Sequence, residues 1–281
     1  MLSNNIGQFN LLKVDRILSQ GAYLSLESGG DVLLPKRQVP NDLEVGDEID
    51  VFLYNDSEDR IIATVDEPFA ELGQFACLEV TDVVKFGLFL DWGLPKDLLV
   101  PQSEVVRPLY NGDRCVVRVC LDEESNRLYA TTKITGFLEI NCSDFKEGDQ
   151  VDAMIYEFSD LGASVIVDGD YRAILHKSDM TEDLKIGDQK SFYVKSFTED
   201  YRMNLSLRKP GFRGILDSKT LILNLLKESN GVLKLHDKSS PEEIRNVLKI
   251  SKKAFKQSIG RLYKDGLINI SADGIQLIVK K

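Results

Sequence analysis

The chain lacks long apolar segments. No apolar run approaches the roughly 18 residues that a membrane-spanning helix needs, so we expect no membrane partner. Residues 1–5 lack the basic start and the apolar stretch of a secretory signal peptide. These two shortages predict a cytoplasmic protein.

Side chains for metal or acid–base chemistry are also scarce. The four cysteines form no C-x-x-C pair and have no histidine nearby, which argues against a zinc site. Cys115 and Cys120 lie in a strand-like stretch and are interpreted as buried free thiols. The chain has only two histidines, His176 and His236, and no acidic motif whose spacing would hold Mg²⁺ and activate water. We expect a non-catalytic protein with no metal and no cofactor.

Positive charge is scarce over most of the chain and is concentrated at its end. The net charge is −10. Residues 209–281 hold 15 Lys and Arg against 7 Asp and Glu, which gives +8, whereas residues 1–208 hold 20 against 38, which gives −18. This split indicates that contact with a polyanion concentrates at the C-terminus. A solvated charged surface is the other interpretation.

One strand pattern occurs three times. Its landmarks are a glycine inside an apolar strand, a Pro or His that ends the next strand, and a later Gly-Asp pair. They lie at Gly21, Gly87 and Gly162, at Pro35, Pro101 and His176, and at 46–47, 112–113 and 187–188. Each set steps by 66 and then by 75 residues. This constant register predicts three copies of one small β-domain.

Each copy alternates apolar and polar residues over short stretches, which is the period of half-buried strands. The units are too short for crossover helices, so their sheets should be antiparallel. Five strands in such a unit bury enough surface only by curling into a closed or nearly closed barrel. The predicted domains are residues 1–67, 72–135 and 145–208.

Near Pro210 the pattern changes to the helical period of 3.6. Residues 212–281 read as helix, short strand, helix, helix and hairpin, which is the order of a winged helix. Ser240-Pro241 and Ser251 are good starts for the second and third helices. The third helix carries five basic residues that suit contact with phosphate: Lys252, Lys253, Lys256, Arg261 and Lys264. The alternatives are contact with protein, which winged helices often make, and an ordinary solvated helix, because surface helices are commonly rich in lysine.

Short motifs in the three copies resemble the RNA-binding domain of ribosomal protein S1. The third copy carries the resemblance in Ile174–Ser178 and Met203–Leu207, and the second carries it in Val84–Phe89 and Arg127–Thr131. The first copy shows it at Gln20–Tyr23. The resemblance implies an OB-fold barrel with one face for single-stranded nucleic acid. That face uses two aromatics around the strand glycine, a histidine ending the next strand, and an arginine on a later strand.

Such a face has a physical basis. Exposed aromatics on strands stack on bases of any sequence, at about 1–3 kcal/mol per base, and a nearby arginine pairs with phosphate or stacks on a base. The candidates carried over are Tyr23 and Arg60 in the first copy, Phe86, Phe89 and Arg127 in the second, and His176, Lys177 and Arg202 in the third. No copy is complete, because Pro35 and Pro101 replace the histidine, and Leu161 and Ser164 replace aromatics.

Structural roles remain open for these candidates. Phe86 and Phe89 are three residues apart on a strand and should point to opposite faces, unless a bulge at Gly87 redirects one. His176 is a structural histidine or a ligand contact. The three arginines either contact the ligand or pair with acids from the turn before them. Residues 1–70 hold 5 Lys and Arg against 13 Asp and Glu, so the first copy has an architectural role as an alternative.

The whole chain is predicted to be mainly β, with three tandem OB-fold (S1-like) five-stranded barrels followed by an α+β winged-helix domain. This order of domains resembles the conserved virulence factor B family of bacterial RNA-binding regulators. The resemblance implies binding of single-stranded RNA in the cytoplasm and an effect on gene expression. A DNA-binding regulator that uses the winged helix, and a scaffold in a translation or RNA-decay complex, are the alternatives.

Overall fold

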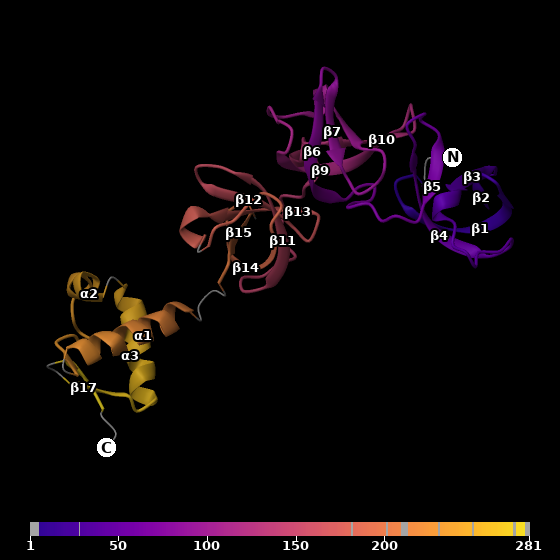
Figure 1. Ribbon diagram of the computed structural model, residues 1–281. Helices are drawn as coiled ribbons and strands as arrows, with labels where there is room; N and C mark the ends of the chain where they lie inside the picture. The colour runs from indigo at the N-terminus through magenta and orange to yellow at the C-terminus, as the bar shows by residue number, and fades with distance from the viewer. Residues whose placement is uncertain are drawn as a thin grey trace. The chain divides into compact units, whose positions relative to one another are not determined.

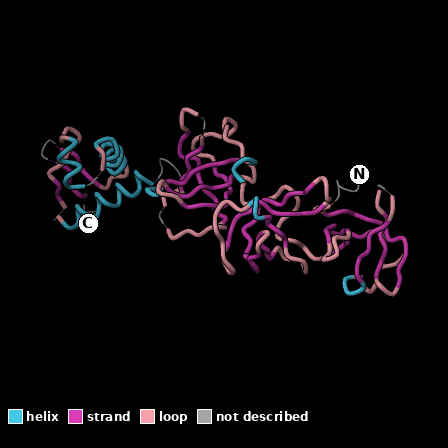
Figure 2. Tube along the Cα trace, turned by 90° about the horizontal axis from the view of Figure 1, so that it is seen from above, coloured by secondary structure: helices cyan, strands magenta, loops and turns pink. Residues whose placement is uncertain are grey.

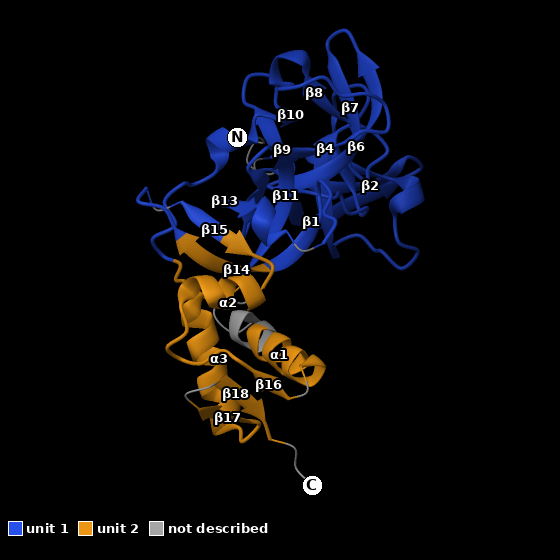
Figure 3. Ribbon diagram, turned by 90° about the vertical axis from the view of Figure 1, so that its left-hand side faces the viewer, with its two compact units in different colours: residues 1–144, 151–191, 197–204 blue, residues 145–150, 192–196, 205–281 orange. Residues whose placement is uncertain are grey.

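A computed structural model describes residues 6–27, 29–180, 182–200, 202–208, 213–229, 231–248, 250–271 and 274–278. The N-terminal residues 1–5, the predicted change of pattern near Pro210 and the centre of the predicted C-terminal hairpin turn, Ala272–Asp273, lie outside them. The chain forms two compact units (Figure 3). One comprises residues 1–144, 151–191 and 197–204, and the other comprises residues 145–150, 192–196 and 205–281.

Each of the three copies folds into five strands (Figure 1). The first copy has β1 (Phe9–Leu18), β2 (Gly21–Ser25), β3 (Asp31–Pro35), β4 (Glu48–Asn55) and β5 (Ile61–Thr64). The second has β6 (Phe75–Val84), β7 (Gly87–Asp91), β8 (Leu98–Pro101), β9 (Arg114–Asp122) and β10 (Arg127–Thr131). The third has β11 (Gln150–Phe158), β12 (Gly162–Val167), β13 (Tyr171–His176), β14 (Gln189–Phe197) and β15 (Met203–Ser206). Short 3₁₀ turns lie at Lys36–Gln38, Gln102–Glu104, Ile134–Phe137 and Lys177–Asp179.

The repeated glycines have one structural cause. Each lies directly opposite the residue that ends the next strand: Gly21 pairs with Pro35, Gly87 with Pro101 and Gly162 with His176. In every copy φ of this glycine is +148° to +157°, and a Cβ would lie 2.0–2.1 Å from a carbonyl oxygen of the partner strand. Only glycine permits both the backbone conformation and the close approach of the strands.

The Gly-Asp pairs also have one role in all three copies. The first strand of each copy carries an irregularity in its pairing, after Val14, Val80 and Ile155. At each of these residues the backbone N–H donates to the carbonyl of the Asp, and its carbonyl accepts from the Gly N–H, over 2.8–3.0 Å. The pair therefore satisfies the backbone where the strand bulges and turns around the barrel.

Two of the three sheets close by backbone pairing. The strand orders β1-β2-β3-β5-β4 and β11-β12-β13-β15-β14 are closed barrels. The first closes where Leu33 of β3 pairs with Ile62 of β5. The second sheet has the order β10-β9-β6-β7-β8, and its outer strands β8 and β10 lie side by side without such a pair in the described residues. The predicted OB-fold barrels are confirmed, and the second carries an open seam.

The first two barrels share a hydrophobic core. Phe52 and Tyr54 of β4 belong to the same buried cluster as Trp92, which follows β7. The Phe52 and Trp92 rings meet edge to face with centroids 5.9 Å apart, a geometry worth about 0.5–1.5 kcal/mol beyond area burial. Asn55 adds polar contacts, because its amide donates to the Asn126 carbonyl and accepts from the Leu128 N–H, both at 3.2 Å. The first barrel is therefore fixed against the second.

The thiols are free, as expected. Cys115, Cys120 and Cys142 are buried, and Cys77 is half-buried. Burial raises the pKa of Cys115 to about 12, so this thiol stays protonated and inert at neutral pH.

The long helices belong to the C-terminal domain (Figure 2). Its elements are α1 (Arg213–Glu228), β16 (Val232–Leu233), α2 (Pro241–Leu248), α3 (Lys252–Lys264), β17 (Ile268–Ser271) and β18 (Gly274–Leu277), and its sheet has the order β16-β18-β17. Ser240 and Glu243 form a reciprocal capping box at the start of α2. The Ser251 hydroxyl caps α3 by accepting from the Ala254 N–H. The predicted winged helix is confirmed.

Candidate nucleic-acid interface

The turn between β6 and β7 positions the first aromatic of the second barrel. Phe86 lies in this turn, after Lys85 and immediately before Gly87. The Gln102 N–H donates to the Phe86 carbonyl at 2.8 Å, which ties the turn to the residue after Pro101. The side chain of Phe86 is 61% exposed, a large value for an aromatic whose backbone is held in place. A fixed and exposed ring is a suitable platform for stacking.

Phe86 and Phe89 lie on the same side of the barrel. Their ring centroids are 6.0 Å apart and the rings meet at 89°. The expectation of opposite faces was wrong, because Phe86 belongs to the turn and is not part of the alternation of β7. The irregularity in pairing lies on β6, between Val80 and Asp82, and not at Gly87. The turn itself therefore brings the two rings together.

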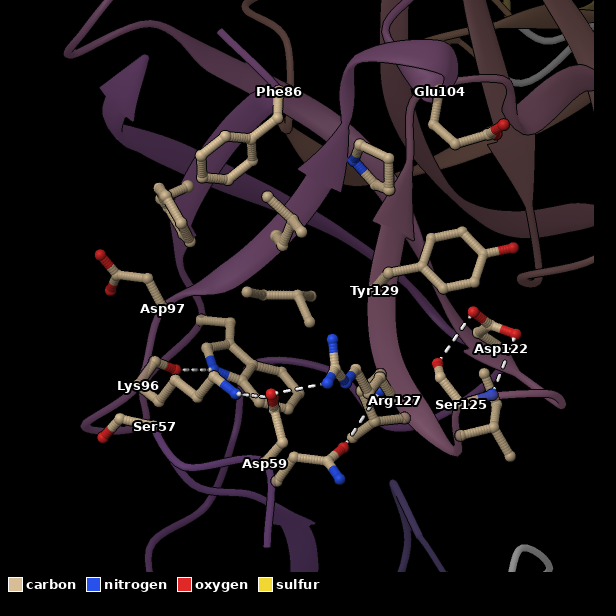
Figure 4. Close-up of a pocket in the computed structure, with 18 of the residues that line it drawn as sticks. Ser57, Asp59, Phe86, Lys96, Asp97, Glu104, Asp122, Ser125, Arg127 and Tyr129 are labelled. Carbon is tan, nitrogen blue, oxygen red and sulfur yellow. Dashed lines mark hydrogen bonds and ion pairs between the residues drawn. The ribbon is translucent and has the colours of Figure 1, made fainter. Parts of the chain in front are cut away.

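A groove of about 900 Å³ runs beside these rings (Figure 4). Besides the two phenylalanines, its walls include Arg127 and Tyr129 of β10 and Pro101 of β8. The three candidates that the sequence assigns to the second copy thus lie on one concave surface. Concave sites lined by apolar groups and a few polar ones are the usual form of binding sites.

The groove lies along the open seam of the second barrel. Leu99 of β8 and Leu128 of β10 line it. They stand 66 residues after Leu33 and Ile62, the pair that closes the first barrel. At the position where backbone pairing closes the first barrel, the second barrel therefore has a groove lined by two leucines.

Tyr129 is a groove residue that the candidate set omitted. It lies two residues after Arg127 on the same strand, so strand alternation places both side chains on one face. The same alternation, counted from Arg127, is enough to predict Tyr129 as a site residue from the sequence alone. Burial, and then the nearby Cys120, raises the pKa of its phenol, which remains a protonated donor at neutral pH.

The charges of the groove are mostly negative. Two cations line it, and five carboxylates do: Asp59, Asp97, Glu104, Asp122 and Glu123. Arg127 lies 2.8 Å and Lys96 3.2 Å from the two carboxylate oxygens of Asp59, which belongs to the first barrel. Lys96 is held at the groove edge because the buried Trp92 indole donates to its carbonyl at 2.7 Å. Both cations therefore already have a partner.

In the first barrel the two candidates contact neighbours of their own domain. The Arg16 guanidinium lies over the Tyr23 ring, 4.2 Å from its centroid. Arg60 donates through Nε and NH2 to Asp56, at 2.9 and 2.7 Å, and lies 2.9 Å from Glu58. Burial opposes ionisation of Asp56, but hydrogen bonds from Arg60 and from backbone N–H groups outweigh it and lower the Asp56 pKa. Arg60 thus pairs with acids of its own turn, one of the two alternatives.

The third barrel presents polar and cationic candidates, and one of them, Lys177, lines a shallow hollow together with the exposed Phe158. His176 Nε2 lies 3.1 Å from the side-chain oxygen of Asn204. Arg202 is exposed before β15, and Lys177 is exposed 3.9 Å from Asp160. All three candidates are polar or cationic, and Lys177 and Arg202 are exposed.

Helix α3, the predicted third helix of the winged helix, is basic on its exposed side. Lys252 is half-buried, and the other four basic residues are exposed. We call these four the α3 basic face: Lys253, Lys256, Arg261 and Lys264. Within the described part of the chain none of the four forms an ion pair.

Among the candidates of the three barrels, the structure therefore gathers those of the second barrel in one site. Phe86, Phe89 and Arg127 share one groove. The candidates of the other two barrels lie on their own domains, and those of α3 form the α3 basic face.

Comparisons with known proteins match three of the four domains. Residues 6–66 and 72–133 match the S1 domain family, and residues 220–277 match the family described as CvfB-like winged helix domain. The second S1 match contains the aromatic residues of the groove, from Phe86 to Tyr129. The winged-helix match contains α3.

Full-length relatives decide the family. The uncharacterized protein YitL of Bacillus subtilis is 30% identical over 270 residues, which cover 93% of this chain and 90% of YitL. Conserved virulence factor B of Staphylococcus aureus is 27% identical over 284 residues, which cover 98% of this chain and 95% of that protein. The chain belongs to the conserved virulence factor B family.

Membership of the conserved virulence factor B family fits the S1 and winged-helix domains of the chain. S1 and winged-helix domains are nucleic-acid-binding types, and together they support a nucleic-acid-binding role. A solved structure with similarity over 98% of this chain is described as a multidomain protein with nucleic acid binding domains from Streptococcus pneumoniae, at 25% identity and a TM-score of 0.44.

The described residues show neither a metal-binding cluster nor a membrane-spanning helix. In the described residues no three His, Cys, Asp or Glu side chains are placed to hold a metal ion. Among the helices that the structure describes, none is long and apolar enough to cross a membrane.

Proposed function

We propose that this member of the conserved virulence factor B family is a non-catalytic, cytoplasmic protein that binds single-stranded RNA and regulates gene expression after transcription. The second barrel supplies base stacking, and the winged helix supplies contact with phosphate. The first barrel serves mainly to position the second.

The observation that carries this proposal is the exposed ring pair in the groove. Phe86 and Phe89 present aromatic surface beside Tyr129, and Arg127 lies at the same wall. Unpaired bases offer free faces to such rings, at about 1–3 kcal/mol per base. Bases in a duplex are already stacked on one another, so the groove favours single strands.

The polar groups of the groove bear on its preference for RNA over DNA. Recognition of single-stranded RNA combines aromatic stacking with hydrogen bonds to base edges, and contacts to the 2′-hydroxyl distinguish RNA from DNA. The groove combines its rings with several acceptor carboxylates and the protonated Tyr129 hydroxyl. Such acceptors suit hydroxyls better than phosphates, and the 2′-hydroxyl is present only in RNA, which supports RNA as the ligand.

The α3 basic face contributes to the affinity for RNA through electrostatic contacts with phosphates. Its four cations are exposed, and cations that neutralise phosphates of a single strand give a slope of log affinity against log salt of about −0.7 per contact. The same face favours the second candidate function, a regulator that reads duplex DNA through α3.

A titration with fluorescently labelled RNA distinguishes these functions. A single-stranded RNA of ten nucleotides, a DNA duplex and the single strand of that duplex compete for the full-length protein at several salt concentrations. We expect the RNA to bind most tightly and its affinity to fall with salt. Preference for the duplex would support the DNA-binding regulator, and absent or salt-independent binding of RNA would refute the proposal.

A further inference from the structure

The cations of the groove are occupied by a carboxylate from another domain. Asp59 lies in the turn between β4 and β5 of the first barrel. One of its oxygens is 2.8 Å from Arg127 NH2, and the other is 3.2 Å from Lys96 Nζ (Figure 4). An anion held through two oxygens by two cations has the contacts that a phosphodiester group would make.

The turn around Asp59 is anchored to the second barrel. Lys96 Nζ also donates to the Asp56 carbonyl at 2.6 Å, and the Asn55 amide bonds the backbone at Asn126 and Leu128. The Asp59 N–H donates to the Asp56 carbonyl at 3.0 Å, and its φ is +62°, in the left-handed region. The tight turn thus holds the Asp59 side chain between Lys96 and Arg127.

The Asp59 carboxylate neutralises one of the two positive charges in the groove and occupies the space between them. The remaining acids are Asp97, Glu104, Asp122 and Glu123, and no other cation lines the hollow in the described residues. A phosphate that enters this groove meets repulsion unless it takes the place of the Asp59 carboxylate between Lys96 and Arg127.

We propose that Lys96 and Arg127 form a phosphate-binding site for the RNA backbone, and that Asp59 of the first barrel occupies it as an intramolecular competitor. The first barrel then limits the affinity of the second barrel for nucleic acid. This inference rests on the proposed function, because the ligand that displaces Asp59 is the phosphate of a bound strand.

The test replaces Asp59 with an uncharged residue of the same shape. Asp59→Asn removes the charge, and asparagine tolerates a positive φ better than other non-glycine residues. The matched control is Asp97→Asn, which removes one negative charge from the same groove. The Asp97 carboxylate accepts from the Thr81 hydroxyl at 2.7 Å and forms no ion pair with Lys96 or Arg127 in the described residues.

The readout is binding of a fluorescein-labelled oligouridine of ten nucleotides to the full-length protein between 50 and 200 mM salt. We expect Asp59→Asn to bind several-fold more tightly at 50 mM salt and to steepen the slope of log affinity against log salt by about 0.7, which corresponds to one phosphate contact. Arg127→Ala in the Asp59→Asn background should remove most of this gain. Equal or weaker binding by Asp59→Asn, or an equal gain from Asp97→Asn, would overturn the inference.

Two further measurements distinguish a failure of this inference from a failure of the proposed RNA-binding function. If neither wild type nor Asp59→Asn binds RNA, the proposed function fails, and calorimetry with tripolyphosphate then tests the phosphate site alone. Binding by Asp59→Asn that Arg127→Ala abolishes would keep the site, whereas no binding would overturn it. If the asparagine variant lacks a melting transition, Asp59→Gly, for which φ of +62° is unstrained, replaces it.

Discussion

Truncation of the exposed ring tests the stacking platform. Phe86→Ala removes a side chain that is 61% exposed, so little buried surface is lost. The main packing loss is the edge-to-face contact with Phe89, which is worth about 0.5–1.5 kcal/mol. We therefore expect a folded protein with a slightly lower melting temperature.

The effect on RNA should be larger than the effect on stability. One lost base-stacking contact costs about 1–3 kcal/mol, which corresponds to about five- to 150-fold in affinity. The slope of log affinity against log salt should stay the same, because no charge is removed. Fluorescence anisotropy with labelled oligouridine at several salt concentrations measures both quantities.

A matched control is available in the same domain. Tyr110 is 70% exposed and is not part of the groove lining, so Tyr110→Ala should leave the affinity unchanged. An equal loss from the two substitutions, or a changed slope for Phe86→Ala, would refute the assignment of the ring to base stacking.

Three more predictions concern charge, backbone and pH. Alanine at all four positions of the α3 basic face should make the salt slope for RNA shallower by about 2.8, in the same titration; an unchanged slope would exclude this face from the phosphate contacts. Gly87→Ala should lower the free energy of unfolding by about 3 kcal/mol through strain and overpacking against the β8 carbonyl, measured by urea denaturation. Gly136→Ala, where a Cβ has open space, should have little effect, and similar losses at both positions would contradict this explanation. Hydrogen bonds from Arg60 and the backbone outweigh burial and lower the Asp56 pKa, so the stability that Asp56→Asn removes should be present above pH 4 and disappear as the pH falls further. A difference in unfolding free energy between wild type and Asp56→Asn that is constant with pH would contradict this origin.

The frame of the fold was predictable because its landmarks are local. The glycine that approaches a carbonyl, as at Gly87, and the Gly-Asp pair that satisfies a bulge are backbone requirements within one small domain, so they recur wherever that domain recurs. The winged helix was predictable for similar reasons, because Ser251 caps α3 and a single apolar stripe marks its buried side.

The arrangement of the site was less predictable. The alternation rule failed for Phe86, because one residue decides whether a side chain belongs to a turn or to a strand. The open seam at Leu99 and Leu128 depends on whether two non-adjacent strands pair, which no local pattern records. The position of Asp59 depends on contacts between domains, through the shared core and Asn55, and these appear only in three dimensions.

The most direct test of the central claim is ultraviolet crosslinking of single-stranded oligouridine to the full-length protein, with the crosslinked peptides identified by mass spectrometry. We expect crosslinks at Phe86, Phe89 or Tyr129, with additional ones near α3. Crosslinks confined to the winged helix, with none in the groove of the second barrel, would contradict it.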